Sequence, residues 1–448
     1  MQIEFIANAS FKLTLASGKV LLTDPWYADG VYYGTWLNFP PLAPARRAEV
    51  EAIRPDWIYI SHIHPDHLDP VSLTVYPRET PILIGRLPEP ALTHLHRAIG
   101  ALGFEDVRIF DFWSRQPLDG GGEFAILPQF AASNAGHADH TGYEIDTSIW
   151  LRDADGTSVF NGVDNALHDD AAREVCDRFG RPDVAILPYA GGSFFPQGCP
   201  AYSHETKLAW RDRIGARRLG DFIRHAEIVG ARWTVPAAGS YVLGGRVAPF
   251  SQYLHQATPP EIAAAWEEAP FAGALELCHM ASGDVIDVAA GAVVRNEAAL
   301  FRSYTPAERH AFANSRASDP LPHDAVQVPD AFAIDWNRLI GKAAKTLAGA
   351  AAGMNLDIAY DIEIVVQPNT IASTPAEGVT YRFALDNGTP PPEGRRFIRF
   401  GMDDGMMLMV LLGAANWNNV EIASLLTCER VPDTQDPSIH KLMNSFKL

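Results

Sequence analysis

The feature that most limits how this chain can fold is an apolar segment that ends abruptly in histidines and aspartates. Residues 57–70 read WIYISHIHPDHLDP, so a strand-like run leads directly into His62, His64, Asp66 and His67. Side chains two positions apart in an extended backbone point to the same side, so the imidazoles of His62 and His64 can converge. The proline that follows predicts a turn that brings Asp66 and His67 toward the same region. The pattern predicts a site for one or two metal ions at the end of a strand.

The chemical nature of these side chains narrows the choice of metal. Mixed imidazole and carboxylate donors suit zinc, iron or manganese. The alternative is a set of ordinary surface histidines in a loop, but four ligand-type residues in H-x-H-x-D-H spacing disfavour it. The four cysteines are far apart and form no C-x-x-C pair, so the sequence predicts neither a disulfide framework nor a cysteine zinc site.

Composition excludes several classes of partner. With 47% hydrophobic and 20% charged residues over 448 positions, the chain predicts a compact protein with one large and one smaller domain, or two domains. The net charge of -18 disfavours nucleic acid and membrane surfaces. The N-terminus lacks a basic stretch followed by an apolar run, and no segment offers about 18 uninterrupted apolar residues. We therefore expect a cytoplasmic protein.

The order of strand-like and helix-like segments predicts the fold class. Short β-branched and aromatic runs dominate the first part, and segments with a 3.6-residue period separate some of them. This order predicts an α/β protein with an αββα sandwich over residues 1–290. Residues 291–448 are predicted to form a smaller α+β region, with a helix at 336–353, strands at 361–368 and 395–402, and a hairpin at 402–412. Residues 305–332 are expected to connect the two parts.

Several segments resemble a known superfamily. The HIHPDH segment is similar to the signature of the metallo-β-lactamase superfamily, whose αββα sandwich matches the predicted order of elements. The segments LLTDPWYADGVYYGTWLNFPP, EIDTSIWL, GVDN, YAGGSFFP and PAAGSY resemble the catalytic part of CMP-N-acetylneuraminate hydroxylases. The C-terminal segment from NWNNVEIASLL onward resembles hydroxylases that act on UDP-N-acetylmuramate. Those hydroxylases carry a Rieske domain before this fold, and this sequence begins directly with the fold.

The resemblance implies a ligand set. It places His62, His64 and a later histidine around one metal, and Asp66 and His67 around another. Asp164 would be the bridging carboxylate, because it follows a strand in the FNGVDN segment. The later histidine is predicted to be His140, with His137 as its substitute. Asp66 is also the candidate catalytic residue.

One departure from the hydrolases of this superfamily bears on the reaction. Their last ligand is a histidine just after a final strand, yet residues 233–245 read WTVPAAGSYVLGG and contain none. This favours an iron-dependent oxygenase that acts on a polar small metabolite, amide-bearing or nucleotide-linked, over a zinc or manganese hydrolase of a phosphodiester, lactone or ester. A non-catalytic scaffold with a vestigial site is the third hypothesis. An oxygenase would need a separate ferredoxin or reductase as electron donor, unless the substrate supplies the electrons.

Two loops are candidates for substrate binding. Trp26, Tyr33 and Trp36 belong to an aromatic loop that either walls the pocket or packs onto the sandwich as core. Tyr189 begins a glycine-rich segment whose backbone amides either receive an anionic group or form a plain turn.

Overall fold

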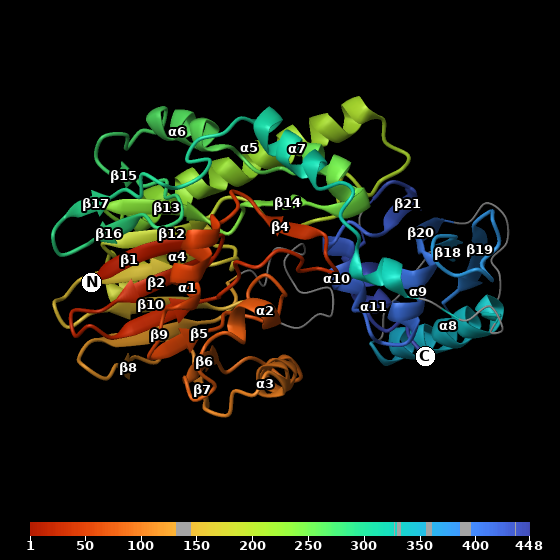
Figure 1. The fold of residues 1–448 in the computed structure, drawn as a ribbon, viewed down its shortest axis with the longest axis horizontal. Helices are drawn as coiled ribbons and strands as arrows, with labels where there is room; N and C mark the ends of the chain where they lie inside the picture. Colours follow the sequence, from red (N-terminus) through yellow and green to blue (C-terminus); the bar gives the residue numbers. More distant parts are fainter. Residues whose placement is uncertain (131–144, 327, 329–332, 355–360, 386–395, 435) are drawn as a thin grey trace.

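The computed structural model describes residues 1–130, 145–326, 328, 333–354, 361–385, 396–434 and 436–448. Two sheets lie face to face in the first part of the chain (Figure 1). The first has the order β17-β16-β1-β2-β3-β5-β6-β7. Its strands are β1 (Gln2–Ala7), β2 (Ser10–Thr14), β3 (Val20–Thr23), β5 (Trp57–Tyr59), β6 (Ile82–Gly85), β7 (Val107–Phe110), β16 (Val285–Asp287) and β17 (Ala292–Val294).

The second sheet has the order β15-β13-β12-β11-β10-β9-β8. Its strands are β8 (Gln116–Pro117), β9 (Glu123–Leu127), β10 (Ser148–Arg152), β11 (Ser158–Asn161), β12 (Val184–Pro188), β13 (Trp233–Ala237) and β15 (Glu276–Leu277). A two-stranded ribbon joins β4 (Trp36–Asn38) to β14 (Tyr241–Leu243).

Side chains that alternate between the two faces of each strand pack the sheets against each other and against the helices. In β10, Ile149 and Leu151 belong to the apolar cluster between the two sheets, and Trp150 belongs to the cluster beneath helices. In β5, Tyr59 likewise faces the other sheet while Ile58 packs toward helices. Because successive side chains in a strand point to opposite faces, each sheet buries both surfaces. The predicted αββα sandwich is confirmed.

Helices cover the outer faces of the sandwich. The elements on the first sheet's side are α1 (Pro44–Glu51), α2 (Pro70–Leu73) and α3 (Ala91–Ala101). The second sheet is covered by α4 (Asp169–Phe179), α5 (His204–Val229) and α6 (Pro259–Glu267). The helix α7 (Pro306–Ser315) follows later in the chain. Two 3₁₀ turns are also present, η1 (Gly245–Tyr253) before α6 and η2 (Pro322–Ala325) after α7. None of the helices in the described ranges combines the length and apolar content needed to cross a bilayer.

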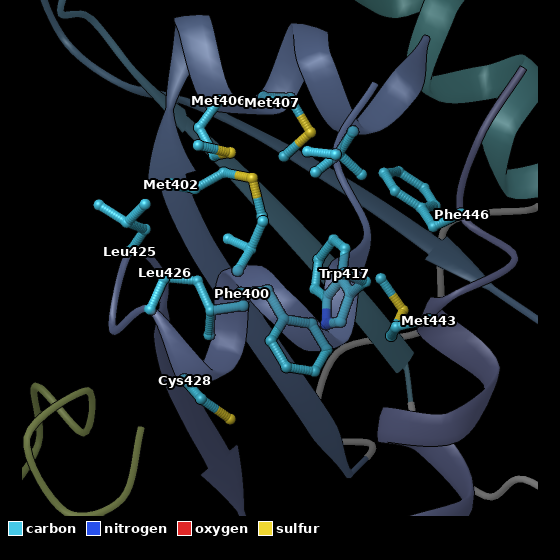
Figure 2. Packing of buried hydrophobic residues seen from close by; sticks show 14 of the residues in the cluster. Phe400, Met402, Met406, Met407, Trp417, Leu425, Leu426, Cys428, Met443 and Phe446 are labelled. Carbon is cyan, nitrogen blue, oxygen red and sulfur yellow. The ribbon is translucent and has the colours of Figure 1, made fainter. Parts of the chain in front are cut away.

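The C-terminal part forms a sheet of its own. Its order is β19-β18-β20-β21, from β18 (Asp361–Gln367), β19 (Val379–Ala384), β20 (Phe397–Asp403) and β21 (Thr427–Val431). The accompanying helices are α8 (Trp336–Gly353), α9 (Asp404–Leu411), α10 (Trp417–Ile422) and α11 (Pro437–Met443). Figure 2 shows Phe400, Met406, Trp417, Met443 and Phe446 gathered into one apolar core. The predicted helix at 336–353 and the strands near 361–368 and 395–402 are confirmed.

The hairpin predicted at 402–412 is wrong. The chain leaves β20 and enters α9, where the Asp403 carboxylate accepts a hydrogen bond from the Met406 backbone N–H at 2.9 Å. This is an N-cap, which satisfies one of the free N–H groups of the first turn and favours a helix. Residues 305–332, expected to be a connection, also contain the helix α7.

The C-terminal part packs directly against the aromatic loop of the sandwich. Trp26, Tyr32 and Trp36 share one apolar cluster with side chains of α8, α9, α10 and α11. The Trp36 indole donates to the Ile422 backbone oxygen at 3.2 Å. Figure 1 shows α10 and α11 on the side of the C-terminal sheet that faces the sandwich. The division of the chain at residue 290 stays a prediction, and the first sheet itself continues to Val294.

A buried carboxylate fixes the end of the first sheet and gives a testable effect on stability. The Asp284 side chain is fully buried and accepts bonds from Arg302 Nη2 (2.8 Å), Arg295 Nη1 (2.8 Å) and the Asn296 backbone N–H (2.7 Å). Burial alone would raise the pKa of Asp284, but these donors lower it from 3.8 to about 2. A depressed carboxyl pKa contributes stability that is present above about pH 4 and is lost as the pH falls toward 2.

We expect Asp284→Asn to lower the free energy of unfolding by about 2 to 3 kcal/mol at pH 7. The difference from the wild type should shrink as the pH falls from about 4 toward 2, because the wild-type carboxylate is then protonated and no longer stabilises the fold. Urea denaturation at several pH values measures this. Asp287→Asn, a more exposed carboxylate nearby, is the control and should change stability by less than about 0.5 kcal/mol. A loss that is the same at every pH would contradict this account of Asp284.

Candidate metal centre

Neighbouring parallel strands bring the histidine cluster to one edge of the first sheet. β3 and β5 pair in parallel, with Thr23 opposite Tyr59, so the residues that follow both strands emerge together. Asp24, the residue after β3, adopts a left-handed backbone with φ 38° and accepts a hydrogen bond from the Ser61 backbone N–H at 2.8 Å. At the other end of the loop, the Asp69 carboxylate caps α2. The loop that carries the cluster is therefore held at both ends.

His62 and His64 converge as the sequence predicts. The distance between His62 Nε2 and His64 Nδ1 is 2.9 Å, and Asp146 Oδ1 lies 3.7 Å from His62 Nε2. One ligand atom from each of these three residues lies within 4.8 Å of the others. The remaining ring nitrogens are also held, since His62 Nδ1 lies 2.9 Å from Ser61 Oγ and His64 Nε2 lies 3.3 Å from Asn418 Oδ1. This first donor group is oriented toward a common point.

A second donor group forms around His67. Its Nε2 lies 3.3 Å from Asp164 Oδ2 and 3.5 Å from Asp66 Oδ2, and its Nδ1 lies 3.2 Å from Asp24 Oδ2. The Tyr32 hydroxyl donates to Asp66 Oδ1 at 2.6 Å, which fixes that carboxylate. His62, His67 and Asp164 also bring one ligand atom each within 4.8 Å of one another. His62 thus belongs to both groups.

These distances fit a bound ion. Ligand bonds of about 2.0 to 2.2 Å place two donors on one ion about 3.0 to 3.5 Å apart, which is the spacing around His67 Nε2. That nitrogen is buried and has no hydrogen-bond partner of good geometry among the described residues. Buried polar atoms are normally satisfied, so an orphaned ring nitrogen between two carboxylates indicates a missing ligand. The residues present therefore fit a metal ion.

The surroundings shift the pKa values of His62 and His67 in opposite directions. Burial lowers the pKa of His62 well below its usual value of 6.5, and the neighbouring His67 and His64 lower it further. His62 is therefore neutral and keeps a lone pair for a ligand bond. Burial also disfavours the charged form of His67, but Asp66, Asp164 and Asp24 raise its pKa well above 6.5. The carboxylates around His67 thus favour a positive charge at their centre.

The cluster opens into a large cavity between the sandwich edge and the C-terminal part. The cavity has a volume of about 800 Å³, which suits a small metabolite. His64, Asp66, Asp146 and Asp164 lie in its wall, and α10 contributes Asn418, Glu421 and Ile422 on another side. The C-terminal part therefore helps to enclose the candidate site.

The structure brings together most of the predicted ligands. His62, His64, Asp66, His67 and Asp164 meet at one edge of the sandwich, although their assignment as ligands stays a prediction. His137 and His140 lie outside the described residues. Sequence reasoning missed Asp146, which lies two residues before β10, and an acidic residue just before a buried strand is the signal that could have found it.

The predicted substrate-binding residues have different environments. Trp36 lines the cavity and stacks on Tyr241, with ring centroids 3.4 Å apart. Trp26 is fully buried in the apolar cluster, which agrees with the core interpretation of its loop. The Tyr33 hydroxyl accepts from the Asn416 backbone N–H at 2.8 Å, and the Tyr189 hydroxyl lies 3.2 Å from Ser240 Oγ. The cavity wall does not include Trp26, Tyr33 or Tyr189, and their role in substrate binding stays a prediction.

Comparison with known proteins agrees with this architecture. Residues 2–207 match the family described as a beta-lactamase superfamily domain. This part of the chain belongs to the beta-lactamase superfamily. The chain is 26% identical over 249 residues to a putative Rieske 2Fe-2S iron-sulfur protein of Mycolicibacterium smegmatis, covering 53% of this chain and 43% of that protein.

Two further relatives differ from each other in reaction type. Cytidine monophosphate-N-acetylneuraminic acid hydroxylase of Xenopus laevis is 27% identical over 205 residues, or 43% of this chain and 32% of that protein. The mitochondrial N-acyl-phosphatidylethanolamine-hydrolyzing phospholipase D of Saccharomyces cerevisiae is 24% identical over 251 residues, or 53% of this chain and 47% of that protein. The chain thus spans less than half the length of these curated relatives.

Proposed function

We propose that this chain is an iron-dependent oxygenase that hydroxylates a polar small molecule, amide-bearing or nucleotide-linked. One observation carries the proposal: three imidazoles and three carboxylates meet at the wall of a cavity of about 800 Å³. The proposed ligands are His62, His64 and Asp146 in one group and His67, Asp66 and Asp164 in the other, with His62 close enough to contribute to both. A donor set this rich in carboxylates suits iron or manganese at least as well as zinc. The hydroxylase relative supports the same reaction type.

The segment after β13 supports an open coordination position. Ala237, Ala238 and Gly239 stand where hydrolases of this superfamily are expected to carry a histidine, and the Ala238 N–H donates to the Asn8 backbone oxygen at 3.2 Å. No imidazole can reach the site from these positions. When bound, iron with vacant positions in a histidine and carboxylate field supplies the capacity to activate dioxygen.

The chain's own residues hold the site in shape. Tyr32 keeps Asp66 in place, and Asp24 and Ser61 orient the ring of His67. Partners of this kind fix the ring orientation and the tautomer of a ligating histidine. Asn418 does the same for His64 from the C-terminal part, so one residue of the cavity wall in α10 also orients a proposed ligand.

The reaction requires electrons from outside the site. A substrate C–H bond, dioxygen, two electrons and two protons give a C–OH group and water. We propose that a separate ferredoxin or reductase delivers the two electrons.

A hydrolase is the second candidate. The relative that hydrolyses N-acyl-phosphatidylethanolamine favours it. In that case the same residues would hold zinc or manganese, and a water with a lowered pKa would attack a phosphodiester, lactone or ester.

Metal analysis combined with oxygen uptake distinguishes the two. The protein is purified without added metal, its metal content is measured by mass spectrometry, and it is reconstituted anaerobically with Fe(II), Mn(II) or Zn(II). We expect iron to support oxygen consumption in the presence of a chemical reductant, and the His62→Ala variant to lack it. Tightly held zinc with turnover of a chromogenic phosphodiester, and no oxygen uptake with iron, would favour the hydrolase and contradict the oxygenase.

A further inference from the structure

The helix α5 carries arginines into the cavity that holds the metal cluster. Arg217, Arg218 and Arg224 all lie in its wall. Arg224 is neutralised, because it pairs with Asp169 at 2.7 Å and with Asp221 at 2.9 Å. Arg217 and Arg218 make no ion pair and no side-chain hydrogen bond with any described residue. Neither guanidinium therefore has a direct ion-pair partner among the described residues, and the carboxylates of Asp221 and Asp164 act on Arg218 only from a greater distance.

Arg218 is the more informative of the two. Its side chain is half-buried, and its Nε atom is fully buried without a hydrogen-bond partner in the described ranges. Burial, followed by the nearby charge of Arg217, lowers the pKa of Arg218. A guanidinium withdrawn from water and left unpaired destabilises the folded chain. Such a group suits a site in which an anionic ligand supplies the missing partner.

A glycine-rich loop faces this guanidinium. The loop follows β12, and a Cβ atom added at Gly191 would lie 3.5 Å from Arg218 Nη2, so the backbone itself is next to the charge. At Gly192 a Cβ atom would lie 2.8 Å from the Trp36 ring, so a side chain there is excluded. Neither the Gly191 nor the Gly192 N–H donates to an acceptor among the described residues. Free amides in a loop of this kind bind anions.

We propose that Arg218, Arg217 and the loop 191–193 form a subsite for a phosphate group of the substrate. The guanidinium fork and the backbone amides offer more donors than a planar carboxylate can use, which suits a tetrahedral, doubly charged group. The protein carries a net charge of -18, so this patch supplies local attraction that the rest of the surface does not. This inference names the substrate class of the oxygenase proposed above and rests on that proposal.

Calorimetric titration of the full chain with phenyl phosphate and with benzoate tests the subsite. We expect phenyl phosphate to bind more tightly than benzoate. Arg218→Gln should weaken the binding of phenyl phosphate about tenfold to a hundredfold, and Arg218→Lys should weaken it less, because the charge remains while the fork is lost. Arg213→Gln is the matched control: Arg213 is exposed on the same helix and lies outside the cavity wall, so affinity should not change.

Measuring metal content in every sample separates this proposal from the proposed function. Binding that depends on Arg218 in protein without metal supports the subsite, even if the oxygenase fails. Binding that Arg218→Gln and Arg217→Gln leave unchanged, and that disappears when metal is removed with a chelator, overturns the subsite while the oxygenase stands. Equal affinity for benzoate, or no binding of phenyl phosphate by the wild type, also overturns it. Thermal unfolding of each variant verifies that the chain is folded.

Discussion

His62→Ala is expected to remove almost all bound metal while the protein still unfolds cooperatively. His62 is a member of both groups of potential ligands, so its loss takes a donor from each. The fold should persist, because the two sheets are held by an extensive apolar core of which the His62 ring is not a part. Metal content by mass spectrometry and thermal unfolding of the same sample measure the two effects.

A control variant and two further ligand variants test this prediction. His94→Ala changes an exposed histidine on α3 and should keep the wild-type metal content. His64→Ala and Asp66→Ala each remove a donor from one group and should also reduce bound metal. Retention of full metal content by His62→Ala would contradict both donor groups.

Asp24→Ala is expected to weaken metal binding about tenfold to a hundredfold, although Asp24 belongs to neither donor group. The Asp24 carboxylate is fully buried, lies 3.2 Å from His67 Nδ1 and accepts the Ser61 backbone N–H. Its removal frees the His67 ring to turn and leaves a buried N–H group unsatisfied. The second effect should cost about 1 to 3 kcal/mol of stability.

Asp24→Asn separates the two effects. The amide oxygen can still accept the Ser61 N–H, so stability should return toward the wild type, but the negative charge beside His67 is gone. Competition for metal with a chromogenic chelator measures the affinity, and urea denaturation measures the stability. Wild-type metal affinity in both variants would show that Asp24 has no influence on the metal.

The local part of the site was predictable because it depends on one short segment. His62 and His64 are two residues apart at the end of a strand, so the geometry of an extended chain alone makes them converge. Asp146 was not predictable in this way, because it joins them through the packing of the second sheet on the first. The Thr147 hydroxyl, which donates to the Ser61 backbone oxygen at 2.7 Å, ties the two sheets together at this point. Asn418 reaches His64 from the other end of the chain.

The fold likewise has parts that the sequence predicted and parts that it did not. The sandwich followed from alternating apolar strands with helices between them, and it is present. The hairpin predicted for the methionine-rich segment 402–412 was wrong. A short run that is apolar on every side shows neither a strand period nor a helix period, so its pattern does not distinguish the two. In the segment called a connection, Thr305 and Glu308 form a capping box that marks the start of α7. That capping-box pattern is present in the sequence and predicts the start of a helix, although the segment was predicted to be a connection.

Anomalous diffraction at metal absorption edges, from crystals of the full chain, tests the central claim most directly. We expect an anomalous peak at the edge of the first sheet, with nitrogens of His62 and His64 or His67 and a carboxylate oxygen about 2.0 to 2.2 Å away. The iron edge identifies the metal of the proposed oxygenase. A crystal of metal-replete protein with no peak among these side chains, or with the ion bound elsewhere, would contradict the account.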